Sequence, residues 1–247
     1  MILGPDGSRL SKRHGATSVE EYQKLGYLPE AMVNYLSLLG WSTEESQQLF
    51  AAGELVQKFA LERCGKSAAI FDPAKLLCMN GEYIRKCDLT ELTNRVMPFI
   101  KDAGLVQDVN VPPEQFNFIK SCVALEQEKI KLLADTPKLI DFLVQDTFKL
   151  DEKAVEKVMK HPGVVGLVME IKERIEKAPE FTAASLEKLC RDYAEEKGIK
   201  TSAVFHPLRV ATSGRTQGPS LFHYMEVLGK AKTIQRIAKT CAELSVR

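Results

Sequence analysis

Residues 28–40 read LPEAMVNYLSLLG, a stretch with the features of an amphipathic helix that has a defined start and end. Pro29 suits the first helical turn, because the N–H that proline lacks would have no helical partner there. The large apolar residues that follow recur at three- and four-residue spacing, as on one face of a helix. Gly40 then supplies a stop signal. The stretch therefore predicts a helix with one buried face.

Similar patterns predict helices along most of the chain. Asp72-Pro73 repeats the start signal and Asn80-Gly81 the stop signal, and Asp88 or Thr90 can cap a helix that reaches Ile100. Further helices are predicted over 113–133, 139–148, 153–160, 164–177, 182–198, 206–212, 220–228 and 231–244. Residues 68–71 are only a weak strand candidate. We expect an all-α fold of three consecutive helical units with joints near 88 and 150, hence 1–88, 89–150 and 151–247.

The composition is that of an ordinary globular protein. The 247 residues are 45% hydrophobic and 27% charged, which argues against disorder. The 34 basic and 33 acidic side chains give a net charge of +1, so no global field calls for nucleic acid or a membrane. No apolar run reaches the length of a membrane span.

The charge is nevertheless unevenly distributed along the chain. Residues 198–247 have a net charge of +6 and the remainder −5. A basic segment of this kind fits contact with a polyanion, and it fits a solvated helical surface equally well.

The six cysteines point to a reducing compartment and to no metal site. None forms a C-x-x-C pair or stands at ligand spacing from a histidine. Most of them fall in apolar helical patterns, where we expect them to serve as small core residues. The N-terminus has no signal-peptide run, and we interpret it as the middle of a longer chain.

The most informative motif is residues 4–15, GPDGSRLSKRHG. Gly-Pro-Asp-Gly is a strong turn signal, and Ser11, Lys12 and Arg13 follow it on a short cationic loop. Such a loop could bring Lys12 onto a triphosphate and offset negative charge that develops during phosphoryl or nucleotidyl transfer. It is not a Walker A loop, because the G-x-x-x-x-G-K-[ST] spacing is absent. Taken alone, the loop is more simply a solvated basic turn.

Four blocks of sequence in order resemble the glutamyl-tRNA synthetase family of class I aminoacyl-tRNA synthetases. The first, residues 10–15, is similar to the family's KMSKS-type signature. The others are residues 28–41, residues 71–85, and residues 206–230, which begin HPLRVA and end LGK. Together they span most of the chain, which makes the resemblance far more specific than one motif.

The resemblance implies a C-terminal half of a bacterial-type enzyme, starting just before its signature loop. The first unit would be a helical stem-contact unit and the next two would be helical anticodon-binding domains. The catalytic domain with the other ATP motif would precede residue 1, in cis. The parent enzyme would use ATP, with Mg²⁺ expected beside it, to attach glutamate to tRNA(Glu), and this piece would be inactive alone.

The resemblance also implies roles for individual residues. Lys12 falls on the lysine that contacts ATP, with Ser11 and Arg13 beside it. Lys129 falls where the family often has an arginine that reads the third anticodon base. Lysine is a point donor and lacks the planar bidentate geometry of arginine, so acceptance of tRNA(Gln) is an open alternative. Another alternative is that Lys129 is simply an exposed helix lysine.

In the closing block, Arg209 matches a position that contacts the anticodon. Gly218, Pro219 and Leu221 fall in the loop that packs around the first anticodon base in relatives. Single-stranded bases are read when they are splayed against apolar surfaces and backbone groups, which a Gly-Pro loop exposes. The same Gly-Pro pair is also an ordinary helix-entry turn.

We therefore expect a cytoplasmic, monomeric protein that binds tRNA(Glu), with no membrane association and no metal site of its own. One alternative is a part of a non-discriminating synthetase that accepts tRNA(Gln) as well. Another is a non-enzymatic helical interaction module, in which the basic segment is merely a solvated surface.

Overall fold

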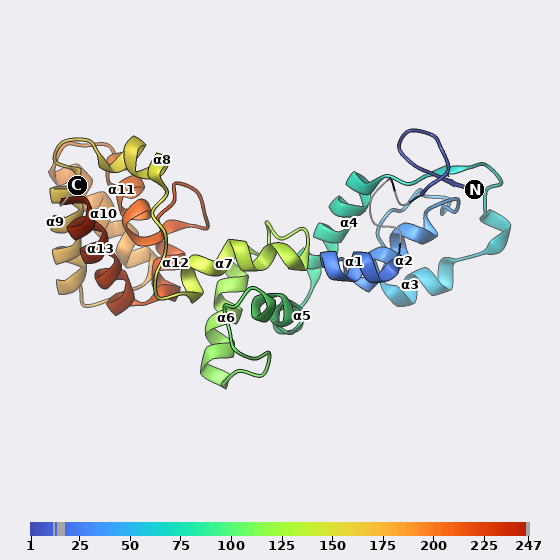
Figure 1. Cartoon of the computed structure of the whole chain (residues 1–247), viewed down its shortest axis with the longest axis horizontal. Coiled ribbons are helices and arrows are strands. Elements are labelled where there is room, and N and C mark those ends of the chain that lie inside the picture. The colour runs from blue at the N-terminus through green and yellow to red at the C-terminus, as the bar shows by residue number, and fades with distance from the viewer. Residues whose placement is uncertain (12, 14–17, 246–247) are drawn as a thin grey trace. The chain divides into compact units, whose positions relative to one another are not determined.

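The computed structural model describes residues 1–11, 13 and 18–245. They form two compact units, each built from two stretches of chain. Unit 1 comprises Met1–Val109 and Gln127–Pro137, and unit 2 comprises Asn110–Glu126 and Lys138–Arg247. The described residues are mostly helical, which confirms the expected all-α class (Figure 1). The division at 88 and 150 stays a prediction.

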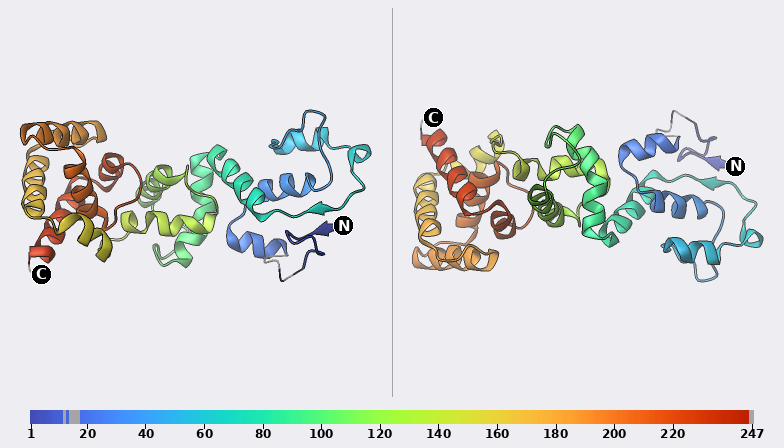
Figure 2. Two further views of the ribbon diagram at one scale, coloured as in Figure 1. Left: turned by 90° about the horizontal axis from the view of Figure 1, so that it is seen from above. Right: turned by 90° about the horizontal axis from the view of Figure 1, so that it is seen from below.

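Unit 1 combines helices with one short parallel strand pair. Its elements are β1 (Ile2–Leu3), α1 (Val19–Leu25), α2 (Pro29–Ser37), α3 (Ala52–Lys58), the 3-10 turn η2 (Leu61–Arg63), β2 (Ala69–Ile70), α4 (Pro73–Lys86), α5 (Leu89–Asp102) and the 3-10 turn η3 (Leu133–Asp135). In the strand pair, Ile2 lies opposite Ala69 and Leu3 opposite Ile70 (Figure 2). The weak strand candidate at 68–71 is thus β2, and its partner is the apolar stub at the N-terminus.

The start of α4 follows the sequence signal. The Asp72 side chain accepts hydrogen bonds from the backbone N–H groups of Ala74 and Lys75. The Tyr35 hydroxyl of α2 in turn donates to the Asp72 carbonyl at 3.0 Å and accepts from its N–H at 2.6 Å. Tyr35, Phe71 and Leu76 are buried in one core cluster between α2 and α4. Burial of these large side chains fixes the position of the capped helix.

The expected stop at Asn80-Gly81 is wrong, because α4 continues to Lys86. Asn80 is fully buried and uses its amide for long-range contacts instead of a helix cap. Its Oδ1 accepts from the Leu28 N–H at 2.8 Å, and its Nδ2 donates to the Lys131 carbonyl at 2.5 Å. Long-range hydrogen bonds thus override the local stop signal. Asn80 joins three segments of unit 1, namely α4, the start of α2 and the segment that contains Lys131, and we call this the Asn80 junction.

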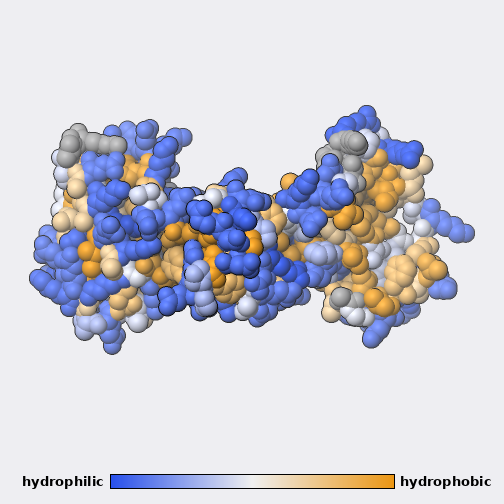
Figure 3. All heavy atoms as spheres, turned by 60° about the horizontal axis from the view of Figure 1, so that its bottom comes forward, coloured by the Kyte–Doolittle hydropathy of each residue, from blue (hydrophilic) through white to orange (hydrophobic). Residues whose placement is uncertain are grey.

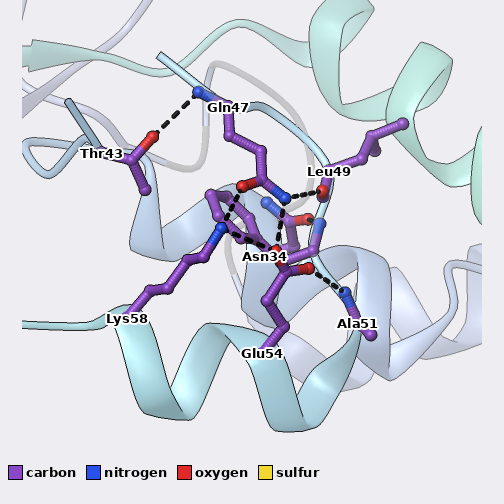
Figure 4. A network of polar contacts seen from close by, with 8 residues as sticks. Asn34, Thr43, Gln47, Leu49, Ala51, Glu54 and Lys58 are labelled. Atoms are coloured by element: carbon purple, nitrogen blue, oxygen red, sulfur yellow. Dashed lines mark hydrogen bonds and ion pairs between the residues drawn. The ribbon is translucent and has the colours of Figure 1, made fainter. Parts of the chain in front are cut away.

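Trp41 is a core anchor, as its position after Gly40 suggests. It is 3% exposed and packs against Phe50 and Phe59, with ring centroids 5.7 and 5.4 Å away. The irregular segment between α2 and α3 is held by polar side chains (Figure 4). There the Gln47 amide donates to Glu54 at 2.9 Å and accepts from Lys58 at 2.7 Å.

In the described part of unit 2, all regular secondary structure is helical. Its helices are α6 (Pro113–Glu126), α7 (Thr136–Val144, whose first two residues belong to unit 1), α8 (Glu152–Ala154), the π-helix η4 (Val155–Met159), α9 (Val164–Lys177), α10 (Ala183–Glu196), α11 (Ser202–Ser213), α12 (Leu221–Leu228) and α13 (Lys230–Ser245). Helix α13 packs along α9 and α11 (Figure 1). The break at His161-Pro162-Gly163 is confirmed, since Gly163 has φ +82° and precedes α9.

Several predicted helices have different bounds, and the one expected over 206–212 runs from Ser202 to Ser213. The helix expected over 113–133 ends at Glu126, and the one expected over 139–148 runs from Thr136 to Val144. The apolar pattern over 113–133 continues past the helix end because Ile130 and Leu133 are buried from a turn and a 3-10 segment. Periodicity alone does not separate these cases.

Three of the six cysteines are core residues, fewer than the sequence suggests. Cys122, Cys190 and Cys241 are buried, whereas Cys64 and Cys78 are exposed. Burial raises the pKa of the Cys122 thiol and of the Cys190 thiol to about 12. These two thiols therefore stay protonated at neutral pH. Separately, none of the described helices has both the length and the apolar character that crossing a bilayer requires.

The Asn80 junction predicts a large effect on the stability of unit 1. Asn80→Ala should lower the free energy of unfolding by about 1–3 kcal/mol, because the buried Leu28 N–H loses its acceptor. Urea unfolding followed by fluorescence of Trp41, the only tryptophan, measures this unit. Asn94→Ala, at an exposed site on α5, is the matched control. Equal midpoints for the two variants would contradict the assigned role.

A pH effect is expected at the ion pair between α2 and α5. Arg95 donates to both Glu30 carboxylate oxygens, at 3.0 and 2.6 Å, and these hydrogen bonds lower the pKa of Glu30. A carboxylate whose pKa is lowered on folding adds stability above its unfolded pKa and loses it as the pH falls.

Glu30→Gln should therefore destabilise unit 1 at pH 7 by about 0.5–1 kcal/mol, a modest value because the pair is partly exposed. The difference from wild type should vanish as the pH falls from about 5 to 3. Urea midpoints across this range measure it, with Glu45→Gln in an exposed loop as control. A difference that persists at the lowest pH would rule out the ion pair as its source.

Candidate nucleic-acid interface

The first candidate region is the tight turn before the signature. The Gly4 N–H donates to the Ser8 carbonyl at 2.7 Å and the Gly7 N–H to the Gly4 carbonyl at 3.0 Å. Gly7 has φ +75°, and Leu3 forms an antiparallel bridge with Arg9. The turn predicted from Gly-Pro-Asp-Gly is confirmed, and it directs the chain that follows β1 back toward the strand.

Of the three signature residues, the structure describes Ser11 and Arg13, while Lys12 lies outside the described residues. Arg13 donates from Nη2 to the Ser8 hydroxyl at 2.7 Å, and the same nitrogen lies 3.8 Å from an Asp6 carboxylate oxygen. Both side chains of this ion pair are more than half exposed. Because an exposed pair contributes little free energy, the Arg13 guanidinium can exchange Asp6 for another anion at low cost.

The second candidate region is the turn at residues 127–131, where the chain returns to unit 1. The Gln127 amide nitrogen donates to the carbonyls of Ile84 at 2.9 Å and Cys87 at 3.0 Å, at the end of α4. The Arg85 guanidinium lies 3.4 Å from the Glu128 carbonyl, and Asn80 holds the Lys131 carbonyl. The backbone of this turn is thus fixed by side chains of α4 and by its own Gln127.

Lys129 is exposed at the outer part of that turn. Lys129 does not lie on a helix, because α6 ends at Glu126. The alternative that it is simply an exposed helix lysine is therefore wrong about the helix. Ile130 beside it is fully buried and anchors the turn in the core. The arrangement presents the Lys129 side chain from a rigid backbone.

The third candidate region is residues 213–219, the last residue of α11 and most of the loop that leads to α12. Gly214 ends α11 with φ +75°, and a Cβ there would lie 2.3 Å from the Lys149 carbonyl oxygen. The Gly214 carbonyl accepts from the Asp151 N–H at 2.9 Å. Only glycine fits this close approach of two backbones, which attaches the start of the loop to the segment after α7.

The end of the loop is attached to α11 by Arg209. Its Nη1 donates to the Pro219 carbonyl at 2.8 Å, and its guanidinium lies 5.6 Å from the Tyr224 ring centre. Gly218 is exposed, Pro219 is buried, and Leu221 is 5% exposed within the core of unit 2. The structure therefore brings Arg209, Gly218 and Pro219 together. Leu221 follows them in the sequence, in the first turn of α12.

Sequence reasoning missed the two arginines that support this loop. Arg215 forms an ion pair with Asp141 at 2.7 Å and lies 4.9 Å from the Phe142 ring centre. Arg236 is buried, and its guanidinium donates to backbone carbonyls. Arg215 stands in the closing block, but its partner is 74 residues away, and no local pattern marks such a pair.

Some of the basic side chains between residues 198 and 247 are engaged in contacts within the protein. Lys230 donates to the Ala178 carbonyl at 2.8 Å, and Lys232 pairs with Asp146 at 2.8 Å. Lys200 and Lys239 are exposed. The excess of positive charge between 198 and 247 is therefore a mixture of structural cations and solvent-facing ones. Among the described residues, no three His, Cys, Asp or Glu side chains come close enough to hold a metal ion.

Comparisons with known proteins show which families match this chain. Residues 91–241 match the family described as "Anticodon binding domain", and residues 1–78 match "tRNA synthetases class I (E and Q), catalytic domain". The chain is 44% identical over 237 residues to the glutamate–tRNA ligase of Moorella thermoacetica and 48% identical over 237 residues to that of Elusimicrobium minutum. In both, the matched region is 96% of this chain and 48% of the relative, so the chain spans about half the length of the curated relatives it matches.

Solved structures give the same assignment. A glutamate tRNA ligase from Elizabethkingia meningosepticum, crystallised in complex with its amino acid, superimposes with a TM-score of 0.83 at 28% identity, covering 99% of this chain and 50% of that one. The glutamate-tRNA synthetase of Elizabethkingia anophelis gives a TM-score of 0.79 at 28% identity, covering 98% and 50%. The chain therefore belongs to the glutamyl-tRNA synthetase family of class I aminoacyl-tRNA synthetases and contains its anticodon-binding domain.

Proposed function

We propose that this chain binds the anticodon arm of tRNA(Glu), as the C-terminal part of a cytoplasmic, monomeric glutamate–tRNA ligase. The observation that carries the proposal is the loop 213–219, which is fixed at both ends and exposed at Gly218. Fixed backbone groups suit a splayed base, because its edge is then met without reordering the protein.

The proposed base contacts come from both units. Lys129 would donate to the third anticodon base from its rigid turn. Arg209 would face the first base while it holds the Pro219 carbonyl, and Leu221 would support the loop from below. Exposed lysines such as Lys200 and Lys239 would meet phosphates, which makes binding weaken as salt is raised.

ATP would be used by the whole enzyme and not by these residues alone. The donor set fits one side of a triphosphate, since Arg13 is exposed and paired only with residues of its own loop, Asp6 and Ser8, among the contacts described above. Bound ATP would supply the activated phosphate for forming the glutamyl adenylate, with Mg²⁺ expected beside it. Ser11, Lys12 and Arg13 would hold and neutralise its phosphates.

The catalytic domain in cis is the partner that this proposal requires. Every strongly exposed large hydrophobic side chain among the described residues lies between residues 1 and 70, the stretch that matches the class I catalytic domain. Hydrophobic residues gather over unit 1 on the face shown in Figure 3. A cleft of about 430 Å³ on unit 1, lined by Met1, Leu36 and Phe59 among others, adds to this surface. Contact with the rest of the catalytic domain would cover it.

The specificity of the proposed enzyme depends on Lys129. A lysine makes a single-point contact where an arginine makes two, so discrimination against the guanine of tRNA(Gln) would be weaker than in relatives with arginine. A strict enzyme and a non-discriminating one remain the two forms of this proposal. A helical module that binds no tRNA is the competing class.

Fluorescence anisotropy with an unmodified tRNA(Glu) transcript tests the proposal. We expect affinity that falls steeply between low and moderate salt. A transcript whose third anticodon base is changed from C to G should bind more weakly to a strict enzyme and equally to a non-discriminating one. Equal, feeble binding to tRNA(Glu) and to unrelated RNA would leave only the competing class, a helical interaction module that binds no tRNA.

The role of Lys129 predicts a specific loss. If the chain prefers C, Lys129→Gln should remove about 1 kcal/mol of that preference, or roughly a factor of five, the low end for one base contact. The salt slope should be unchanged. Lys101→Gln, at an exposed site on α5 of the same unit, is the matched control.

Uniform weakening for every RNA with a smaller salt slope would instead make Lys129 a phosphate contact. In that case the third base is read elsewhere. An unchanged preference in the variant would remove Lys129 from the interface altogether.

A further inference from the structure

We propose that Arg236, a buried residue of α13, is the positioning residue for the loop 213–219. This inference rests on the proposed function for its consequence, since it assigns Arg236 to the reading of the first anticodon base without contact with RNA. The geometric part concerns only contacts within unit 2 and can be tested without RNA.

Arg236 joins the end of α11, which leads into the loop, to the segment after α7, which contacts the loop at Gly214. Its Nη1 donates to the Thr212 carbonyl at 3.0 Å, and its Nη2 donates to the Gln145 carbonyl at 2.7 Å. Arg236 is only 4% exposed, and its guanidinium lies 4.9 Å from the Phe148 ring centre. A planar guanidinium places two donor nitrogens in fixed, diverging directions toward the two carbonyls, whereas lysine has a single donor nitrogen on a flexible stem.

These carbonyls are the ones that a helix leaves without partners. The last four carbonyls of an α-helix accept no hydrogen bond within it, and in α11 they include those of Ala211 and Thr212. Thr240, one turn after Arg236 on α13, donates to the Ala211 carbonyl at 3.0 Å. Arg236 and Thr240 together therefore cap the C-terminus of α11 at the residue before the loop begins, and a cation is favourable there.

The burial of Arg236 is costly, which points to a role that an apolar residue would not fill. Desolvation lowers the pKa of Arg236, and Asp146 and Tyr224 offset this only in part. An apolar side chain of similar size would fill the space without this cost but would leave two buried carbonyls unpaired. The arginine lies where the start of the loop, α13 and the segment after α7 meet.

The consequence is a loop whose two ends are fixed and whose middle is exposed. Arg236 and the Gly214–Asp151 contact fix its start, and Arg209 fixes its end at Pro219. Residues 216–218 between them are exposed. Base reading needs the loop backbone held to within a fraction of an ångström, so losing one fixed end should loosen readout more than overall binding.

The test compares Arg236→Lys with wild type in the complete chain. Lysine keeps the charge but has one donor nitrogen in place of two, so it does not reproduce the two diverging hydrogen bonds. A second variant, Phe148→Leu, removes the ring beside the guanidinium and leaves the arginine. Gln235→Ala, an exposed neighbour on α13, is the matched control. Far-UV circular dichroism establishes that all variants are folded.

The first measurement is amide hydrogen exchange without RNA. We expect exchange at residues 213–218 to be about tenfold faster in Arg236→Lys, and faster in Phe148→Leu, with α9 and α10 unchanged. Unchanged exchange in the loop of both folded variants overturns the proposal. Equal acceleration throughout unit 2 also overturns it, because Arg236 would then be a general core residue.

The second measurement is anisotropy with tRNA(Glu) transcripts that differ in the first anticodon base. The ratio of their affinities should fall about fivefold or more in Arg236→Lys while the salt slope stays the same. An unchanged ratio beside a loosened loop contradicts the positioning role. If wild type itself shows no preference at this base, the proposed readout fails, and the exchange measurement still decides the structural claim.

Discussion

The amide side chains of Asn80 and Gln127 hold together parts of unit 1 that are far apart in sequence. Asn80 bonds residues 52 and 51 positions away, and Gln127 reaches carbonyls at the end of α4 about as far along the chain. Between them the chain leaves unit 1 after Val109 and returns at Gln127. Because a buried amide that loses its partner costs more than a surface contact contributes, these bonds specify where the chain returns.

The same physical device recurs in unit 2 with arginine in place of amides. Arg209 and Arg236 bond backbone carbonyls at the two ends of one loop, and Arg215 pairs with Asp141 on α7. In the first two cases a polar side chain bonds backbone carbonyls that no helix satisfies, whereas Arg215 bonds a side-chain carboxylate. The regions proposed to meet RNA are thus irregular segments made rigid by side chains, which is how a mostly helical protein can present backbone groups to a base.

Helix starts could be read from the sequence because their signals are local. Asp72, Asp88 and Thr182 all cap helices with their side chains, as their positions before apolar periodic stretches indicate. Helix ends were less predictable. Asn80-Gly81 resembles a stop, but the partners that keep α4 helical there are Leu28 and Lys131, which no local pattern reveals. Likewise, the buried Ile130 extends an apolar pattern beyond the end of α6.

The candidate site shows the same difference between local sequence signals and long-range contacts. The family resemblance pointed to Lys129, and its closing block pointed to Arg209 and the Gly218-Pro219 loop, because these positions lie in recognisable sequence. The sequence did not reveal the supporting residues Arg236 and Gln127, since they donate hydrogen bonds to backbone carbonyls that only folding brings near them. Leu221 shows the opposite case, a residue named for RNA contact whose side chain is buried in the core.

The central claim is that this chain meets a tRNA at its anticodon. Nuclease footprinting of a tRNA(Glu) transcript in the presence of the chain tests it most directly, because the readout is the position on the RNA and not the affinity. The account predicts protection of the anticodon nucleotides and of the adjoining stem. Protection spread evenly over the transcript, or no protection at the anticodon under conditions where the complex forms, would contradict it.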